Sequence, residues 1–392
     1  MSSDPHDDHR SALALLALLF FMWGFVTVLG DILVPHLKGL FSLDAATAML
    51  VQMSFFGAYF VVGMPAGWLV ARVGYRGGIV VGLLVAATGA LCFALSSWLT
   101  SYAAFLLALF VLAGGITVLQ VAANPYVTLL GPPRTAASRL NLTQGINSLG
   151  TTLAPVVGSW LILEGQGAQG VRVPYLGIAA VLVVLALVFA RVPLPNPPTE
   201  VRVAVNGSVW RHRRLRLGAL AIFLYVGAEV GIGSMLVLFF GLPEVAGMAP
   251  ADGGYLVSFY WGSAMVGRFV GAALQRRFSP RAVLATGSAL AIVLVLLTVG
   301  LMGTIAVPTL LGVGLFNSIM FPTIFSLAVQ GLGDETSRGS GVLVMAIVGG
   351  ALIPVGMGAL ADAFGYRVAL LATVVAYAYI GWFARSGGEE DA

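Results

Sequence analysis

The sequence predicts an all-α polytopic membrane protein with twelve transmembrane helices in two pseudo-symmetric six-helix bundles. Three observations lead to this fold class. Of the 392 residues, 59% are hydrophobic and only 9% are charged, against about 25% charged in an ordinary soluble domain. Charged and turn-forming breaks divide the chain into apolar lengths near the roughly 20 residues that a helix needs to cross a bilayer. Two sequence blocks also recur in both halves at nearly equal spacing.

The predicted helices span 11–36, 45–71, 77–97, 101–130, 139–163, 173–191, 215–242, 252–275, 281–300, 304–331, 339–361 and 367–384. They imply a tail at 1–10, a bundle at 11–191, a linker at 192–214, a second bundle at 215–385 and a tail at 386–392. If the first residues are cytoplasmic, the inner loops hold sixteen of the 20 basic residues and the outer loops three, with Arg268 inside a helix. This follows the positive-inside rule and predicts that both termini are cytoplasmic. The net charge of +4 then reflects orientation and needs no nucleic-acid partner.

The repeated blocks indicate a duplicated unit. SFFGAYFVVGMPAGWLVAR from Ser54 aligns with SFYWGSAMVGRFVGAALQR from Ser258 at an offset of 204. A second match, at an offset of 199, pairs Ser138, Arg139, Gly150 and Pro155 with Ser337, Arg338, Gly349 and Pro354. Such repeats are typical of secondary transporters, whose substrate site lies at the repeat interface near the bilayer midplane. Coincidence in a glycine-rich chain is the alternative explanation.

Polar residues inside the predicted helices mark candidate sites, because each needs a partner or a watery cavity. The N-terminal half carries Thr27 and Asp31 in helix one, Gln52 in helix two, Gln120 and Asn124 in helix four, and Asn141, Gln144, Asn147, Ser148 and Thr151 in helix five. The helix-five residues fall at helical spacing on one face. That face lines a cavity or forms a hydrogen-bonded contact with another helix.

The C-terminal half adds aromatic rings: Glu229 follows Tyr225 by one turn, Tyr260 and Trp261 are adjacent, and Asn317 precedes Phe321 by one turn. Amides facing rings suit a sugar, whose hydroxyls need hydrogen-bond partners while its C–H faces stack on aromatic rings. The predicted substrate-binding residues are Thr27, Gln52, Gln120, Asn124, Gln144, Asn147, Trp261, Asn317 and Phe321. In the alternative, the amides only join helices, at about 0.6 kcal/mol each, and the rings are packing residues.

Several of these stretches resemble a known family. GDILVPHLK from Gly30, QVAANPYVTLLG from Gln120, RLNLTQGINSLGTTLAP from Arg139, YVGAEVGIGS from Tyr225 and FPTIFSLAVQGLG from Phe321 resemble the fucose:proton symporter family of the major facilitator superfamily. Within it, they are most similar to the glucose/galactose transporter branch. The resemblance implies the twelve-helix facilitator fold, alternating access and a sugar substrate.

The resemblance also assigns roles to residues. Asp31 matches the helix-one aspartate that serves proton coupling and sugar binding, and Gln144 and Asn147 match the sugar-facing amides of helix five. Gln120 stands where fucose permeases carry a titratable glutamate, as in the glucose/galactose pattern. Fucose-branch amides of helix one are replaced by Thr27, Val28 and Gly30, which argues against fucose itself.

Arginines near the cytoplasmic side are predicted gating residues. GWLVARVGYR from Gly67 resembles the superfamily's loop motif, although Ala71 stands at its acidic position, which puts the motif's gating salt bridge in doubt. The predicted gating residues are Arg72, Arg76, Arg268 and Arg276. For Arg268 we expect a cytoplasmic-gate ion pair, but the sequence names no partner.

Asp31 is the predicted proton-coupling carboxyl. An ionised aspartate in mid-helix costs roughly 2.5 to 3.5 kcal/mol on insertion scales, so Asp31 should be neutral during part of the cycle or face water. A carboxyl that is protonated when occluded and ionised when open can carry a proton. The alternatives are a static hydrogen-bond anchor and a Na⁺ ligand. Glu229 is the second coupling candidate, with a structural role as its alternative.

The predicted function is secondary active import of a hexose of the glucose/galactose type by cation symport, with H⁺ favoured over Na⁺. A proton-coupled exporter of drugs or metabolites and a Na⁺-coupled sugar symporter are the alternatives. The sequence has no clustered metal ligands, no nucleophile beside a base and no phosphate-binding loop, which argues against an enzyme, a metal and a cofactor. Cys92 is the only cysteine. We expect a monomer in the lipid bilayer of a bacterial inner membrane.

Overall fold

The computed structural model describes residues 5–43, 47, 50–99, 101–158, 172–192 and 208–386. Within these ranges it does not describe the side chains of residues 5–11, 29–36, 38–39, 155–158 and 250–251. The described residues form helices and connecting turns, with no strand among them. The predicted all-α class therefore holds for the described part of the chain.

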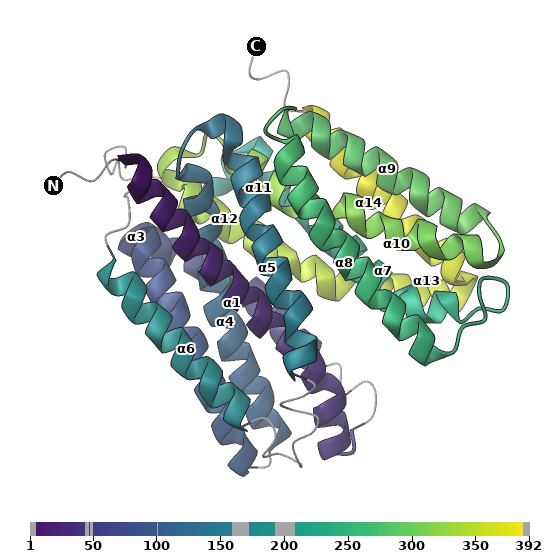
Figure 1. Ribbon diagram of the computed structural model, residues 1–392, viewed down its shortest axis with the longest axis horizontal. Coiled ribbons are helices and arrows are strands. Elements are labelled where there is room, and N and C mark those ends of the chain that lie inside the picture. The colour runs from purple at the N-terminus through teal and green to yellow at the C-terminus, as the bar shows by residue number, and fades with distance from the viewer. Residues whose placement is uncertain are drawn as a thin grey trace. The chain divides into compact units, whose positions relative to one another are not determined.

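The helices of the N-terminal half are α1 (Pro5–Leu40), α3 (Leu50–Leu99), α4 (Tyr102–Leu129), α5 (Ala136–Gly158) and α6 (Arg172–Arg191). Those of the C-terminal half are α7 (Arg213–Phe240), α8 (Pro250–Leu274), α9 (Pro280–Gly300), α10 (Ala306–Asn317), α11 (Met320–Val329), α12 (Thr336–Met345), α13 (Gly349–Phe364) and α14 (Tyr366–Ser386). Figure 1 shows α1, α4 and α6 as long helices; α1 packs against α4, and α6 packs against α3.

Two predicted helices are each divided in the structure, and two others share one label. The predicted second and third helices both lie in α3, and they are separated at Gly74, where the backbone leaves the helical conformation with a φ of 77°. Glycine adopts this left-handed conformation without steric cost, so the chain can reverse there. The predicted tenth helix is divided between α10 and α11, and the predicted eleventh between α12 and α13, which a short 3₁₀ turn (Ala346–Val348) separates. When α3 is counted as two helices, α10 and α11 as one, and α12 and α13 as one, the described helices correspond to the twelve predicted crossings, with ends shifted by a few residues.

Long apolar surfaces support the membrane assignment. Eight helical stretches among the described residues are long and apolar enough to cross a bilayer. On α6, large apolar side chains such as Val173 and Val184 are exposed, at 73% and 57%. Exposed apolar surface is unfavourable in water but not in hydrocarbon. These side chains are therefore expected to face lipid.

The packing divides the chain into two compact units. The first comprises Met1–Pro133, Ile146–Val209 and Gly331–Met345, and the second comprises Arg134–Gly145, Trp210–Gln330 and Ala346–Ala392. In the first unit, α3 packs against α4, α6 and α12, and α1 packs against α4. In the second, α7 packs against α13, α14, α11 and α8, while α10 packs against α8 and α9. Each unit thus contains a short segment from the other half of the sequence.

These exchanged segments pack on the repeated sequence blocks. In the first unit Gly67 of α3 lies so close to α12 that a Cβ there would approach the Ser337 carbonyl oxygen to 2.9 Å. In the second unit the Ser138 hydroxyl of α5 donates to the Ala272 carbonyl oxygen of α8 at 2.6 Å. Ser138 and Ser337 are equivalent positions of the repeat. The duplication seen in the sequence is therefore present in the packing as well.

Candidate functional site

A buried hydrogen bond joins α3 and α4 in the first unit. Gln120 Nε2 donates to Tyr59 Oη at 2.9 Å, and both residues are buried. Asn124, one turn further along α4, is fully buried, and Gln52 of α3 is half-buried. The Tyr59 hydroxyl fixes the Gln120 amide in one orientation, as a recognition amide requires.

A second contact in the first unit joins α1 and α5. Asn147 Nδ2 donates to the Phe20 carbonyl oxygen at 2.7 Å, and Gly24 lies directly against Asn147. One turn further, Thr27 Oγ1 is buried without a hydrogen bond among the described residues. A helical threonine commonly bonds a carbonyl of the preceding turn, and Thr27 forms no such bond within the part of the chain that the structure describes. Asp31 is one turn beyond Thr27 in α1, but its side chain lies outside the described residues.

The second unit contains a buried polar cluster, here called the Glu229 cluster, made of Tyr225 and Glu229 of α7, Tyr260 of α8, Asn317 of α10 and Tyr377 of α14. Asn317 Nδ2 donates to Tyr260 Oη at 2.8 Å and to Tyr377 Oη at 3.4 Å. Tyr260 Oη donates to the Glu229 backbone carbonyl at 3.2 Å. Asn317, predicted from the sequence to bind substrate, thus joins three helices.

Three oxygen atoms of this cluster are buried without a standard hydrogen bond in the described part of the chain: Tyr225 Oη, Glu229 Oε1 and Asn317 Oδ1. Glu229 is only 8% exposed, and its carboxylate interacts with the Tyr225 hydroxyl and with the charge of Arg268. Unpaired buried polar atoms typically cost about 1–3 kcal/mol each. Atoms left in this way in a native fold are candidates for a proton, a water or a ligand.

Arg268 of α8 reaches the α5 segment of the same unit. Its Nε lies 3.4 Å from the Ser318 carbonyl oxygen, and its Nη1 lies 3.5 Å from the Gln144 carbonyl oxygen. The side chain of Gln144 is itself buried. Arg268 therefore stands between the Glu229 cluster and a predicted sugar-binding residue, a pairing that the sequence did not reveal.

The two predicted aromatic residues differ in exposure. Trp261 is 41% exposed and meets Tyr260 edge to face, with ring centroids 5.3 Å apart. Phe321 is buried, and its ring centroid lies 6.0 Å from that of Phe325. Of the two, Trp261 offers the larger ring surface for stacking.

Asn141, on the polar face of α5, joins α5 to other helices of the second unit by hydrogen bonds. Asn141 Nδ2 donates to Gln275 Oε1 at 2.8 Å and lies 3.3 Å from Thr323 Oγ1. Gln275 Nε2 donates to the same threonine at 2.8 Å. At Asn141 the face forms a hydrogen-bonded helix contact, the second of the two possibilities that the sequence left open.

The predicted gating arginines lie in different surroundings. Arg76 donates from Nε to the Phe189 carbonyl oxygen at 2.9 Å, and from Nη2 to that of Ala190. These carbonyls end α6, where the helix dipole favours a cation. Arg72 and Arg276 are exposed. Their gating role stays a prediction.

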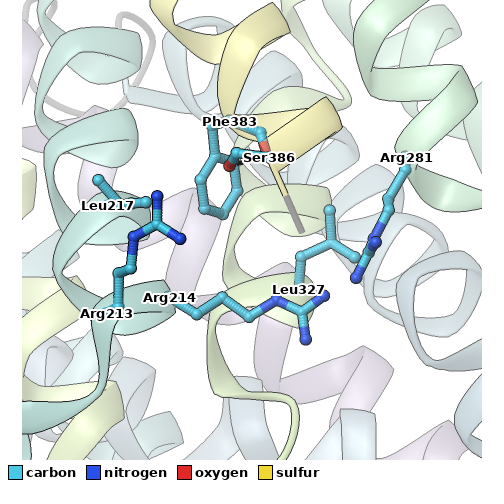
Figure 2. A pocket seen from close by; sticks show the side chains of 7 residues that line it. All are labelled: Arg213, Arg214, Leu217, Arg281, Leu327, Phe383 and Ser386. Atoms are coloured by element: carbon cyan, nitrogen blue, oxygen red, sulfur yellow. Dashed lines mark hydrogen bonds between the residues drawn. The ribbon is translucent and has the colours of Figure 1, made fainter. Parts of the chain in front are cut away.

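A separate, small surface cleft lies in the second unit, at the first turn of α7 and the last turn of α14. Figure 2 shows Arg213, Arg214 and Arg281 around it. Leu217, Leu327, Phe383 and Ser386 complete its lining. Its three guanidinium groups suit an anion and not a neutral sugar, and none of the predicted substrate residues lines it. The described residues also contain no group of three or more His, Cys, Asp or Glu placed to hold a metal ion.

Comparison with known proteins decides the family. The model of the Major Facilitator Superfamily matches residues 13–347. The chain belongs to this superfamily. A crystal structure of a superfamily transporter, FucP, in the outward conformation has a TM-score of 0.89 and 34% identity to this facilitator, covering 97% of this chain and 99% of that one. The predicted twelve-helix facilitator fold is confirmed.

Two relatives support the family branch. The facilitator is 53% identical over 388 residues to the "Glucose/galactose transporter" of Brucella abortus biovar 1 (strain 9-941), covering 96% of this chain and 94% of the relative. It is 34% identical over 406 residues to the "L-fucose-proton symporter" of Escherichia coli (strain K12), covering 95% and 92%. The prediction of a multi-pass membrane transporter, and not an enzyme, is thereby confirmed.

Among the tyrosines that contact the predicted amides, Tyr377 was not singled out from the sequence. Tyr59, Tyr260 and Tyr377 each place a hydroxyl on a predicted substrate amide or next to one. Their common signal is a tyrosine inside an apolar helix, because a buried phenol needs a hydrogen-bond partner. Tyr377 is 60 residues from Asn317 in the sequence, so no local spacing could have linked the two.

Proposed function

We propose that this facilitator imports a hexose of the glucose/galactose type together with a proton, by alternating access. The similarity to the Brucella glucose/galactose transporter, at 53% identity over nearly the whole of both chains, carries the proposal. The proton as coupling ion is supported by the similarity to the E. coli L-fucose-proton symporter. Gln120 in place of a titratable residue leaves proton coupling to another carboxyl.

The proposed sugar ligands include buried amide side chains and one partly exposed aromatic ring, that of Trp261. Gln120 is held by Tyr59, Asn317 is held by Tyr260 and Tyr377, and Trp261 is partly exposed. Fixed amides discriminate hydroxyl positions because a misplaced hydroxyl leaves a buried group unpaired. Thr27, Gln52, Asn124, Gln144, Asn147 and Phe321 complete the proposed set.

Asp31 is the proposed coupling carboxyl. Moving one charge across 100 mV is worth about 2.3 kcal/mol, enough for roughly fiftyfold accumulation of a neutral solute. Thr27 has a buried hydroxyl without a hydrogen bond in the described part of the chain, one turn before Asp31. Glu229 is the second candidate. We further propose a monomer in the inner membrane with both termini in the cytoplasm, an orientation that the distribution of arginines supports.

Radiolabelled glucose and galactose uptake into proteoliposomes tests the proposal, with pH and sodium gradients imposed separately and unlabelled sugars as competitors. We expect a pH gradient alone to drive accumulation, with glucose and galactose competing better than fucose. Asp31→Asn should abolish accumulation while sparing exchange of internal for external sugar. Accumulation driven only by sodium would replace the proton with Na⁺, and an Asp31→Asn variant that still concentrates sugar would remove Asp31 from the mechanism.

A further inference from the structure

We propose that Glu229 is a protonation switch for sugar binding that acts through Arg268 on the first part of α5. When the Glu229 carboxyl is neutral, Arg268 holds the Gln144 carbonyl and keeps this segment in its sugar-binding position. When the carboxyl is ionised, it draws Arg268 away. The inference rests on the proposed function, because it takes Gln144 as a sugar ligand. It gives Glu229 a positioning role that is distinct from energy coupling at Asp31.

The first step is the cost of charge at Glu229. The side chain is 8% exposed in the middle of α7, and an ionised carboxylate is strongly disfavoured there unless it is paired. Glu229 forms no ion pair within the described part of the chain. One of its oxygens has no hydrogen bond there either. This arrangement fits a neutral carboxyl in the conformation described.

The second step is that the charge of Glu229 can change. Burial disfavours a carboxylate and a nearby guanidinium favours it, and Arg268 of the adjacent α8 is such a guanidinium. The other groups that face Glu229 are Tyr260 of α8, Tyr377 of α14 and the uncharged Asn317 of α10. α11 has no titratable residue, and the only one in α13, Asp362, is exposed. The balance therefore lies mainly between burial and Arg268.

The third step is the link to sugar. Arg268 lies two turns after Tyr260 in α8, and the Tyr260 hydroxyl donates to the Glu229 backbone carbonyl at 3.2 Å. The Nη1 of Arg268 lies 3.5 Å from the Gln144 carbonyl oxygen. Its distances to the Ser318 and Gln144 carbonyls, 3.4 and 3.5 Å, are at the long end for hydrogen bonds. A carboxylate is a stronger acceptor for a guanidinium than a backbone carbonyl. Ionising Glu229 would thus pull Arg268 from α5, and sugar affinity would fall as pH rises.

Exchange of internal for external hexose, measured with the same pH on both sides of the membrane, tests the switch because it needs no proton gradient. We expect the apparent KM for hexose to rise at least fivefold between acid and alkaline pH, the lower end of typical coupling between two sites. Adding Glu229→Gln, a neutral isostere, should hold KM at its acid value at every pH. Adding Glu229→Asp should restore the pH dependence. A pH-dependent KM that persists unchanged with Glu229→Gln, or a wild-type KM without pH dependence, would overturn the switch.

Two matched tyrosine variants distinguish a change in the protonation of Glu229 from a general loss of structure. Tyr225 and Tyr175 are both fully buried tyrosines, but Tyr225 faces Glu229, whereas Tyr175 belongs to the first unit. Tyr225→Phe should move the midpoint of the pH dependence, and Tyr175→Phe should leave it in place. Equal midpoints in the two variants would contradict the proposal. Absence of hexose exchange by the wild-type protein would refute the proposed function itself, an outcome distinct from each of these.

Discussion

The contact between α3 and α12 gives a sharp test of the packing. A Cβ added at Gly63 would lie 2.9 Å from the Gly341 carbonyl oxygen and 3.0 Å from both the backbone nitrogen and the Cβ of Met345. Two of these atoms belong to the backbone, so no side-chain rotation relieves the overlap. Gly63→Ala is therefore expected to push α12 away from α3.

The magnitude follows from two opposing terms. Overpacking typically costs about 1–3 kcal/mol, whereas replacing glycine by alanine in a helix gains roughly 0.5–1 kcal/mol. Taking the middle of each range, the net loss for Gly63→Ala is about 1.3 kcal/mol. For a unit of 150–250 residues each kcal/mol shifts Tm by roughly 2–4 °C, so we expect Tm to fall by about 3–5 °C.

Thermal unfolding of the purified protein in detergent measures this shift. Gly57→Ala is the matched control, because it lies in the same helix and a Cβ there meets nothing within 4 Å. The control should keep or slightly raise Tm. If Gly63→Ala and Gly57→Ala melt at the same temperature, the α3–α12 contact is not the close backbone approach described above.

Three further variants test individual contacts. Tyr59→Phe leaves the Gln120 amide without its 2.9 Å acceptor, at a cost of about 1–3 kcal/mol, and should raise the KM for hexose at least fivefold; an unchanged KM would argue against sugar recognition by Gln120. Asn141→Ala removes the 2.8 Å bond to Gln275 and should destabilise the protein by about 1–3 kcal/mol in the same melting assay. Arg76→Ala removes two donors from the end of α6 and should cost only about 0.3–1 kcal/mol; a collapse of folding would assign Arg76 a larger role.

Charge and apolar length predicted where the membrane-spanning helices lie, because both can be read from the local sequence. Arginines cluster at the ends of the apolar stretches, and those stretches became helices. Nothing local indicated that the predicted tenth and eleventh helices would each be divided or that the first part of α5 would belong to the second unit. Such packing depends on shape complementarity between segments far apart in the chain.

The candidate site shows the same limit. Helical spacing identified the polar face of α5, but it could not say that Asn141 contacts Gln275 and Thr323 while Asn147 contacts α1. The sequence identified Arg268 and Glu229 as separate charges inside helices, but it did not indicate that the two lie near each other. Spacing shows which face is polar, and only the fold shows what that face meets.

Sugar-driven proton movement is the most direct test of the account. Proteoliposomes without an imposed gradient would be given glucose or galactose while a pH-sensitive dye reports the external medium. We predict that either sugar makes the medium more alkaline, and that Asp31→Asn abolishes the signal. Hexose entry that moves no protons would contradict the proposed symport.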